Sequence, residues 1–334
     1  MKLLIAGLGS IGQRHYKNLI QLGYKDIIVY RTGKGDRKFV GDFEKTHRPV
    51  VFNDLKKAFA QNPDILIISN PTMFHAEFIK HGIENNVKGI FVEKPIAVSS
   101  KSLENLSKKA EAKNIIVYAA YNLRFHPLLE KMRKIMQDNG IGKILSASVD
   151  MGEYLPDWHP WEDYRKTYAA RSDLGGGVVL TQSHDIDYLY WFFGMPQKIA
   201  SFGGTRTGLE VNADDLVKAV LEYTDGSVAS LHMDFYKRPA RRIFEVMGTK
   251  GTLLWDYHEG TLKLIQHDKN KKIKTILAPQ KFERNEMFIK EMKHFINCAE
   301  RKEEPKITFQ DGINVLKICE GILKSVKFGK TVKI

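Results

Sequence analysis

Three glycines near the N-terminus have the spacing that turns a strand–helix junction into a phosphate site. Gly7, Gly9 and Gly12 form a Gly-x-Gly-x-x-Gly pattern that follows the apolar run 2–6 and opens a helical pattern. In such a turn the first glycine allows a tight bend, the second lets the backbone approach a diphosphate, and the third lets the helix pack on the strand. The positive end of the helix dipole favours phosphate oxygens, so we expect a dinucleotide rather than an empty turn. The residues expected around its pyrophosphate are Gly7, Leu8, Gly9, Ser10, Ile11 and Gly12.

The second apolar run ends in a basic residue where many dinucleotide sites carry an acid. A site that prefers NAD usually places Asp or Glu there, for the ribose 2′-hydroxyl. Here the run ends in Tyr30, Arg31 and Thr32, and the next carboxylate in the sequence is Asp36. Arg31 and Thr32 could hold a 2′-phosphate, and Arg31 could also stack on the adenine. The sequence therefore favours NADP, with NAD as the alternative; a loop arginine exposed to solvent is the remaining interpretation.

A lysine follows another buried run and is the first candidate for catalysis. Residues 89–93 form an apolar run that ends in Glu93, Lys94 and Pro95. In doubly wound sheets, ligands bind at the carboxyl ends of the strands. Lys94 is thus expected over the cleft, near the nicotinamide; the alternative is a strand-end lysine that extends into water.

A histidine in the second half of the chain is the other catalytic candidate. It begins a helical pattern over 183–193, after a glycine loop at 175–177 that we expect to be flexible. The core stripe of this helix is predicted to be Ile186, Leu189, Tyr190 and Phe193. The predicted opposite side carries His184, Tyr188 and Trp191, with Thr181 one turn earlier. If the stripe packs on a sheet, His184 faces the cofactor cleft and meets Lys94, although a lone histidine is more often a core or surface residue.

The elements of the first part of the chain form a β-α alternation. Its apolar runs are short, continuous and rich in Ile, Val and Leu, as parallel strands covered on both faces should be. They lie at 2–6, 26–30, 64–69, 89–93 and 115–120, and helical patterns lie at 11–22, 54–61, 72–85 and 99–113. This predicts an α/β Rossmann domain, a doubly wound parallel sheet, over residues 1–122.

The rhythm changes after residue 122. Longer alternating runs separated by turn signals predict a mostly antiparallel open sheet with helices on one side. The expected strands are 144–154, 198–204, 216–224, 228–236, 242–247, 253–257, 262–267 and 273–277, and the expected helices are 127–139, 183–193, 283–301 and 310–326. Residues 123–334 are thus predicted to form an α+β domain for substrate binding and oligomerisation. The uncovered sheet face suggests a homo-oligomer, a dimer or tetramer.

Composition excludes several classes of function. The net charge is +13, but the lysines are spread along the chain, and the densest run, 269–274, lacks the interleaved aromatics of a nucleic-acid site. A positive field instead favours anionic ligands such as phosphates. No segment is long enough to span a bilayer, so no membrane partner is expected. Cys298 and Cys319 form no cluster, which argues against a metal site and a disulfide framework and suits a reducing, cytoplasmic setting.

Several motifs in one order resemble the glucose-fructose oxidoreductase / inositol dehydrogenase / MocA (Gfo/Idh/MocA) family, over nearly the whole chain. The motifs are Gly7–Gly12, Ser69-Asn70-Pro71-Thr72 with His75, Glu93-Lys94-Pro95, Asn122-Leu123-Arg124-Phe125-His126-Pro127, and Gly175-Gly176-Gly177 leading to His184. The resemblance implies a Rossmann domain followed by an α+β domain, and a catalytic Lys94 beside the substrate with a cis Lys-Pro bond. It adds Ser69, Asn70, Pro71, His75, Glu93 and Lys94 to the cofactor-binding residues. Many members carry an aspartate four residues before the histidine, where this chain has Leu180, and some carry one at the position of Thr181.

The resemblance implies hydride transfer between a nicotinamide and a secondary alcohol or ketone of a sugar, possibly a nucleotide sugar. His184 is the preferred acid–base group because imidazole titrates near neutral pH, and Lys94 would stabilise the developing alkoxide. The alternatives are an inositol-type cyclitol dehydrogenase, an NAD-dependent glycosidase and a non-catalytic cofactor-sensing regulator. Candidate substrate-binding residues are Lys94, Arg124, Trp161, Tyr164, Arg165, Thr181 and His184. A packed surface loop is as good an interpretation of 157–165, and a domain-linking salt bridge is as good for Arg124.

Overall fold

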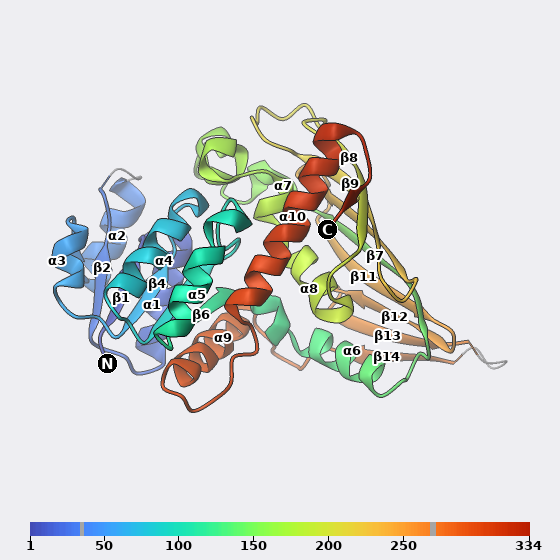
Figure 1. The fold of residues 1–334 in the computed structure, drawn as a ribbon, viewed down its shortest axis with the longest axis horizontal. Coiled ribbons are helices and arrows are strands. Elements are labelled where there is room, and N and C mark those ends of the chain that lie inside the picture. The colour runs from blue at the N-terminus through green and yellow to red at the C-terminus, as the bar shows by residue number, and fades with distance from the viewer. Residues whose placement is uncertain (34–36, 268–271) are drawn as a thin grey trace. The chain divides into compact units, whose positions relative to one another are not determined.

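The computed structural model of the protein describes residues 1–33, 37–267 and 272–334, with side chains of the helix at Arg37 described from Asp42 onward (Figure 1). Asp36 and the first half of the basic run 269–274 therefore lie outside the described residues. The chain divides into two units. Unit 1 comprises Met1–Asn122 and Glu283–Ile313, and unit 2 comprises Leu123–Phe282 and Asn314–Ile334.

Six strands in the described part of unit 1 form one parallel sheet in the order β3-β2-β1-β4-β5-β6. The strands are β1 (Leu3–Ala6), β2 (Ile27–Tyr30), β3 (Val50–Phe52), β4 (Ile65–Ile68), β5 (Gly89–Glu93) and β6 (Ile116–Ala120). The helices are α1 (Ser10–Gln21), α2 (Arg37–His47), α3 (Leu55–Phe59), α4 (His75–Glu84), α5 (Glu104–Ala112) and α9 (Arg284–Ala299). Strands β1 and β4 are buried throughout, as helices on both faces require. The predicted doubly wound parallel sheet is confirmed.

Two elements of unit 1 are absent from the sequence prediction, and one helix was placed in the other domain. Strand β3 has only three residues, none fully buried, and helix α2 is polar on average. Helix α9 packs on α1, β5 and β6. A side chain on Gly89 would clash with Ala299, which shows how closely the helix approaches the sheet. The boundary after Asn122 lies where the sequence places it, but residues 283–313 belong with unit 1.

Register aligns the residues that follow the strands of this sheet. Phe52, Tyr30, Ala6, Ile68 and Val92 are paired across β3, β2, β1, β4 and β5. The next residue on each strand therefore lies in a row along the carboxyl edge, with neighbours about 5 Å apart. We call this the strand-end row; its members are Asn53, Arg31, Gly7, Ser69 and Glu93.

Nine strands in the described part of unit 2 form a second sheet, in the order β14-β13-β12-β11-β7-β10-β9-β8-β15. They are β7 (Ile144–Gly152), β8 (Lys198–Gly204), β9 (Leu216–Glu222), β10 (Val228–Asp234), β11 (Arg241–Gly248), β12 (Gly251–Asp256), β13 (Thr261–Gln266), β14 (Ile273–Leu277) and β15 (Val332–Lys333). Strands β7 and β10 are parallel and the other pairs are antiparallel. The prediction of a large, mostly antiparallel sheet is confirmed, and the two-residue β15 adds an edge that the sequence did not indicate.

Helices cover one face of this sheet (Figure 1). They are α6 (Pro127–Gln137), α7 (Val178–Thr181), α8 (Ser183–Phe193) and α10 (Phe309–Phe328), whose first residues belong to unit 1. Tyr188 of α8 packs on Phe244 and Trp255, with ring centroids 4.8 and 6.0 Å away. Short 3₁₀ helices occupy Thr72–Phe74, Ser100–Ser102, Asn122–Phe125, Leu155–Asp157, Tyr164–Lys166, Tyr168–Ala170 and Ser172–Leu174.

The two cysteines are free thiols in helices α9 and α10, and both are buried. Among the described residues, no helix has both the length and the apolar character needed to cross a bilayer.

Candidate active site

Protein contacts fix two glycines of the N-terminal turn. Gly7 has φ +108°, and a Cβ there would lie 2.8 Å from the backbone N of Asn70. A Cβ on Gly12 would lie 2.2 Å from the carbonyl oxygen of Gly7. No larger residue fits at either position, so the turn itself and the helix–strand contact explain both glycines.

Gly9 has a different environment, which shows that the turn fits a diphosphate. It is the N-cap of α1 with φ −69°, and a Cβ there would meet no protein atom within 4 Å. Neither its conformation nor its neighbours require glycine. No side chain caps this helix and no acid lies in its first turn, so its own residues leave the first N–H groups without a side-chain acceptor. The geometry leaves room for an anion to approach the backbone at Gly9.

Ser69 connects the end of β4 to the glycine turn. Its hydroxyl donates to the carbonyl oxygen of Gly7 at 3.0 Å, and its backbone N–H donates to that of Ala6 at 2.9 Å. Ser69 thus supports the turn from the neighbouring strand. Asn70 and Pro71 follow it and lead into the 3₁₀ helix before α4.

Below Lys94 lies a buried carboxylate that sequence reasoning did not pair. The Glu93 carboxylate binds Nε2 of His15 at 2.7 Å, and His15 of α1 is fully buried. Burial alone would raise the pKa of Glu93, but the hydrogen bond from His15 and the charges of His15, Lys94 and His75 outweigh it and hold the pKa below its usual range. Glu93 is therefore ionised next to Lys94, which is half-buried at the end of β5.

His75 fastens the loops on both sides of this strand end. Its Nδ1 lies 2.9 Å from the carbonyl oxygen of Pro95, and its Nε2 lies 2.8 Å from that of Asn70. The ring is buried, and burial lowers its pKa although both carbonyls and Glu93 act in the opposite direction. His75 thus holds the β4 and β5 loops together through the backbone. The Lys94–Pro95 bond is cis, as the resemblance implies.

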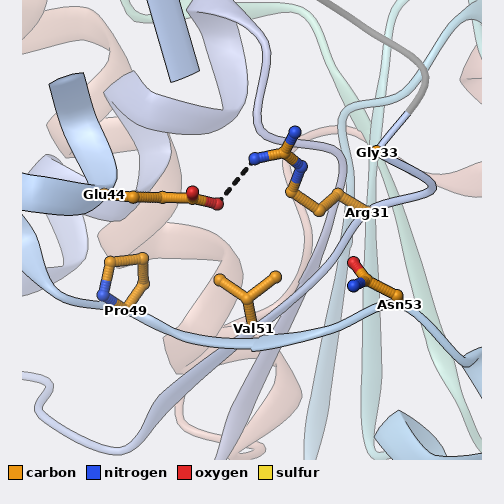
Figure 2. Close-up of a pocket in the computed structure, with 6 residues that line it drawn as sticks. All are labelled: Arg31, Gly33, Glu44, Pro49, Val51 and Asn53. Atoms are coloured by element: carbon orange, nitrogen blue, oxygen red, sulfur yellow. Dashed lines mark hydrogen bonds and ion pairs between the residues drawn. The ribbon is translucent and has the colours of Figure 1, made fainter. Parts of the chain in front are cut away.

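Arg31 leaves the end of β2 and meets an acid that the sequence analysis missed. Its Nη1 lies 2.7 Å from Oε1 of Glu44, which comes from α2 (Figure 2). Its backbone N–H donates to the carbonyl oxygen of Phe52 at 3.1 Å. Thr32, the next residue, is exposed. The basic end of this strand is thus accompanied by a carboxylate.

In unit 2 the glycine loop is tightly packed rather than flexible, which corrects the sequence prediction. A Cβ on Gly176 would lie 2.1 Å from the carbonyl oxygen of Tyr168, and one on Gly177 would lie 2.2 Å from Oδ1 of Asp214. Gly177 also has φ +102°. Because these close contacts exclude any side chain, the glycines fix the start of α7 instead of loosening it.

Two buried ion pairs hold helix α8. Asp185 binds Arg242 of β11, with Oδ1 to Nε at 3.1 Å, and accepts a hydrogen bond from the Tyr188 hydroxyl at 2.8 Å. Asp187 binds Arg124, with Oδ1 to Nη2 at 2.7 Å. Burial acts to lower the pKa of Arg242, but the surrounding acids outweigh it and raise the pKa. Both acids of the helix are thus bound to arginines.

His184 is half-buried at the first turn of α8. The helix has the predicted bounds, and Ile186 and Leu189 are buried as expected. Tyr188 was predicted on the open side with His184, but it is fully buried, because the helix is packed on more than one side. Leu180 and Thr181 are buried in α7, so no carboxylate stands at either family position.

The candidate substrate residues of unit 2 have diverse surroundings. Arg124 is 3% exposed and forms an ion pair with Asp187, as in the salt-bridge interpretation of this residue. The pair does not link two domains, because both partners lie in unit 2. Trp161 is 68% exposed, and the Tyr164 hydroxyl accepts a hydrogen bond from the backbone N–H of Glu210. Arg165 is bound to Asp163 at 2.8 Å. Of these residues, Trp161 presents the most open surface to a ligand.

The structure brings the predicted cofactor residues of unit 1 to one edge of one sheet, and it places Thr181 and His184 on consecutive helices of unit 2. Sequence reasoning missed His15, Glu44 and Arg242, whose partners lie on other elements of the fold. A signal existed for Arg242, because two acids in a mostly apolar helix, at 185 and 187, require buried partners.

Two family models match the chain. One, described as an oxidoreductase family with an NAD-binding Rossmann fold, matches residues 1–121. The other, described as the GFO/IDH/MocA C-terminal domain, matches residues 129–254. Together they cover most of both units.

Known proteins are similar over the full length. Myo-inositol 2-dehydrogenase of Thermotoga maritima is 22% identical over 345 residues, 100% of this chain and 98% of its own. A levoglucosan dehydrogenase, solved with NADH and levoglucosan, has a TM-score of 0.86 at 18% identity and covers 100% of this chain and 99% of its own. The WlbA dehydrogenase of Bordetella pertussis, solved with NADH and UDP-GlcNAcA, has a TM-score of 0.82 at 18% identity and covers 100% and 98%. The two solved structures share the fold of this chain.

Proposed function

The chain belongs to the Gfo/Idh/MocA family of NAD(P)-binding oxidoreductases, and from that premise we propose that it interconverts a secondary alcohol and a ketone of a sugar. The observation that carries the proposal is the strand-end row. It places the open Gly9 turn and the Glu93–Lys94 corner on one edge of the sheet, two strands apart.

The bound nicotinamide would accept or supply the hydride, and the side chains would manage the proton. His184 is proposed to take the hydroxyl proton in oxidation and to return it in reduction. Lys94 is proposed to donate a hydrogen bond to the same oxygen and to stabilise its developing charge. Glu93 and His15 hold the backbone that carries this lysine. The two acids of the same helix, Asp185 and Asp187, are bound to Arg242 and Arg124.

A nucleotide sugar is the finer proposal for the substrate. The exposed ring of Trp161 offers a stacking surface for a sugar or a base. The net charge of +13 favours an anionic substrate. The relative solved with UDP-GlcNAcA supports the same class. A cyclitol is the second candidate, because the inositol dehydrogenase is similar over the whole chain.

The cofactor and the assembly are further parts of the proposal. Arg31 supports NADP, as the sequence predicts, whereas its ion pair with Glu44 supports NAD. A homo-oligomer is supported by the outward face of the second sheet, whose exposed apolar residues are Phe202, Val220, Val228, Met247, Ile273 and Leu277.

A substrate panel tests the proposal. Free aldoses, inositols and UDP-sugars are incubated with the protein and either NAD or NADP, and reduced-nicotinamide absorbance is followed against the Lys94→Ala variant. We expect the wild-type protein to turn over one class of polyol, and we expect Lys94→Ala to lose that turnover. Glycoside cleavage with no net change in absorbance would favour the glycosidase. Tight cofactor binding with no reaction on the whole panel would favour the regulator, and no affinity for either dinucleotide would refute the proposal.

A further inference from the structure

A pocket of about 460 Å³ lies at the edge of unit 1 beyond Arg31 (Figure 2). Two of its lining residues, Arg31 and Asn53, belong to the strand-end row, and the others come from β3, from the loops and from α2. The lining residues are Arg31, Gly33, Glu44, Pro49, Val51 and Asn53. The pocket thus lies on the carboxyl edge, one strand from the glycine turn, where the adenosine half of a dinucleotide would extend.

Within this pocket the guanidinium of Arg31 already has a carboxylate partner. Figure 2 shows the side chains of Arg31 and Glu44 pointing toward one another across the cavity, and the two atoms are 2.7 Å apart. Their side chains are 15% and 32% exposed, so water screens the pair only in part. Among the described side chains at the end of β2, the positive charge of Arg31 is therefore balanced by the carboxylate of Glu44.

A ribose and its phosphorylated form meet this pair differently. A 2′-hydroxyl can donate to the free lone pairs of Glu44, which is the role usually played by an acid at the end of the second strand. A 2′-phosphate carries a charge of about −2, has no proton to donate at neutral pH and is repelled by the carboxylate. A phosphate that binds Arg31 must therefore share the guanidinium with Glu44 or displace the carboxylate.

We propose that Glu44 is the residue that sets the cofactor preference of this protein, and that it sets it in favour of NAD. The carboxylate accepts from the ribose 2′-hydroxyl and neutralises the arginine that would otherwise recruit NADP. The acid comes from α2 rather than from the end of β2. The sequence around Arg31 therefore shows only the arginine and favours NADP. This inference rests on the proposed function, since it concerns the same dinucleotide site.

Titration of the whole protein with NAD and NADP tests the inference, with Glu44→Gln as the variant. We expect wild-type protein to bind NAD at least tenfold more tightly than NADP. Glu44→Gln removes the repulsive charge with little change in shape, so NADP affinity should rise about tenfold while NAD affinity changes little. Adding Arg31→Ala to this variant should abolish the gain, because the phosphate then has no cation.

Asp42→Asn is the matched control. It removes one negative charge from the same helix. The Asp42 side chain is 74% exposed, and its Oδ1 lies 3.8 Å from Nζ of Lys45. The ratio of the two affinities should stay at the wild-type value. A wild-type preference for NADP, or an unchanged ratio in a Glu44→Gln protein that binds both cofactors, would overturn the role of Glu44 and leave the oxidoreductase proposal standing. Failure of the wild-type protein to bind either cofactor would overturn both.

Discussion

At the scale of single residues, the position of Lys94, which we propose to be catalytic, depends on the side chains packed around Glu93. Glu93 is a buried carboxylate, and such a charge is stable only when partners compensate for the lost hydration. His15 supplies that compensation at 2.7 Å from a helix 78 residues earlier in the chain. His75 joins the two adjoining loops through their carbonyl groups. These contacts give the backbone of Lys94 one fixed position.

Replacement of the lysine itself tests the proposed chemistry. Lys94→Ala should lower turnover by about 10²-fold or more, since one hydrogen-bond donor to a developing oxyanion contributes that much. Cofactor affinity, measured by titration, should change little because the glycine turn is intact. Lys101→Ala, at an exposed position after the same strand, should keep full turnover. Undiminished turnover in Lys94→Ala would remove Lys94 from the reaction.

Sequence patterns name residues that stand at recognisable local features and miss contacts between elements. Gly7, Gly9 and Lys94 were named as candidates because they stand at a turn or a strand end. His15 and Glu44 were missed because a one-dimensional pattern does not indicate that their side chains meet Glu93 and Arg31. The partner of Arg31 also lies on a helix that the sequence prediction left out.

At the scale of elements, helix α8 shows the same division. Its ends were predicted at the observed residues because the apolar stripe begins and stops there. The burial of Tyr188 was not predicted, because a stripe indicates one packed face and cannot indicate a second. The prediction of a flexible glycine loop was wrong for a related reason. The loop is held by close contacts with Tyr168 and Asp214, which approach it from other segments.

The start of helix α6 should make stability depend on pH. His126 is the N-cap, and its Nδ1 accepts a hydrogen bond from the backbone N–H of Leu128 at 3.2 Å. Burial, and then the charge of Arg242, lower its pKa from 6.5 to about 4. Between these two values the unfolded chain binds a proton that the folded chain does not. Stability therefore falls as pH drops through this range, by at most about 3 kcal/mol.

His126→Asn checks this, because asparagine keeps a capping acceptor and does not titrate. Urea unfolding at a series of pH values should give a shallower decline for this variant than for wild type. His258→Asn, at an exposed position in the same unit, should follow the wild-type curve. Parallel curves for wild type and His126→Asn would contradict the assignment.

The glycine loop before α7 should tolerate no side chain. Gly177→Ala combines a left-handed backbone with a 2.2 Å approach to Asp214, and we expect a loss of about 2–4 kcal/mol in the free energy of unfolding. Gly204→Ala has a similar φ, +115°, but meets no atom within 4 Å, so it should lose only about 1–2 kcal/mol. Chemical unfolding of both variants separates the clash from the backbone strain, and equal losses would show that the clash is relieved.

At the scale of the whole molecule, chain order hides one part of the organisation. Residues 283–313 return to the first sheet after the second sheet is complete. The sequence assigned them to the nearer domain, because contiguous segments usually form contiguous domains. The close approach of Ala299 to Gly89 is the contact that decides otherwise, and it joins positions more than half the chain apart.

The outward face of the second sheet should control assembly. Phe202 is 76% exposed there and Val220 is 48% exposed, and such apolar groups gain free energy when another protein surface covers them. We expect light scattering to give a multiple of the chain mass, and Phe202→Asp combined with Val220→Asp to weaken assembly at least about tenfold. Phe328→Asp, which is 59% exposed at the end of α10, is the control. A wild-type monomer would contradict the expectation.

The strand-end row has one more consequence, which concerns how such a protein can change over time. Arg31 and its acid stand on one side of the glycine turn, and Glu93 with Lys94 stands on the other, each attached to its own strand. Substitutions at one end need not disturb the other. A lineage with this edge can therefore switch the pool of reducing equivalents it draws on while it keeps its reaction, or acquire a new reaction while it keeps its pool.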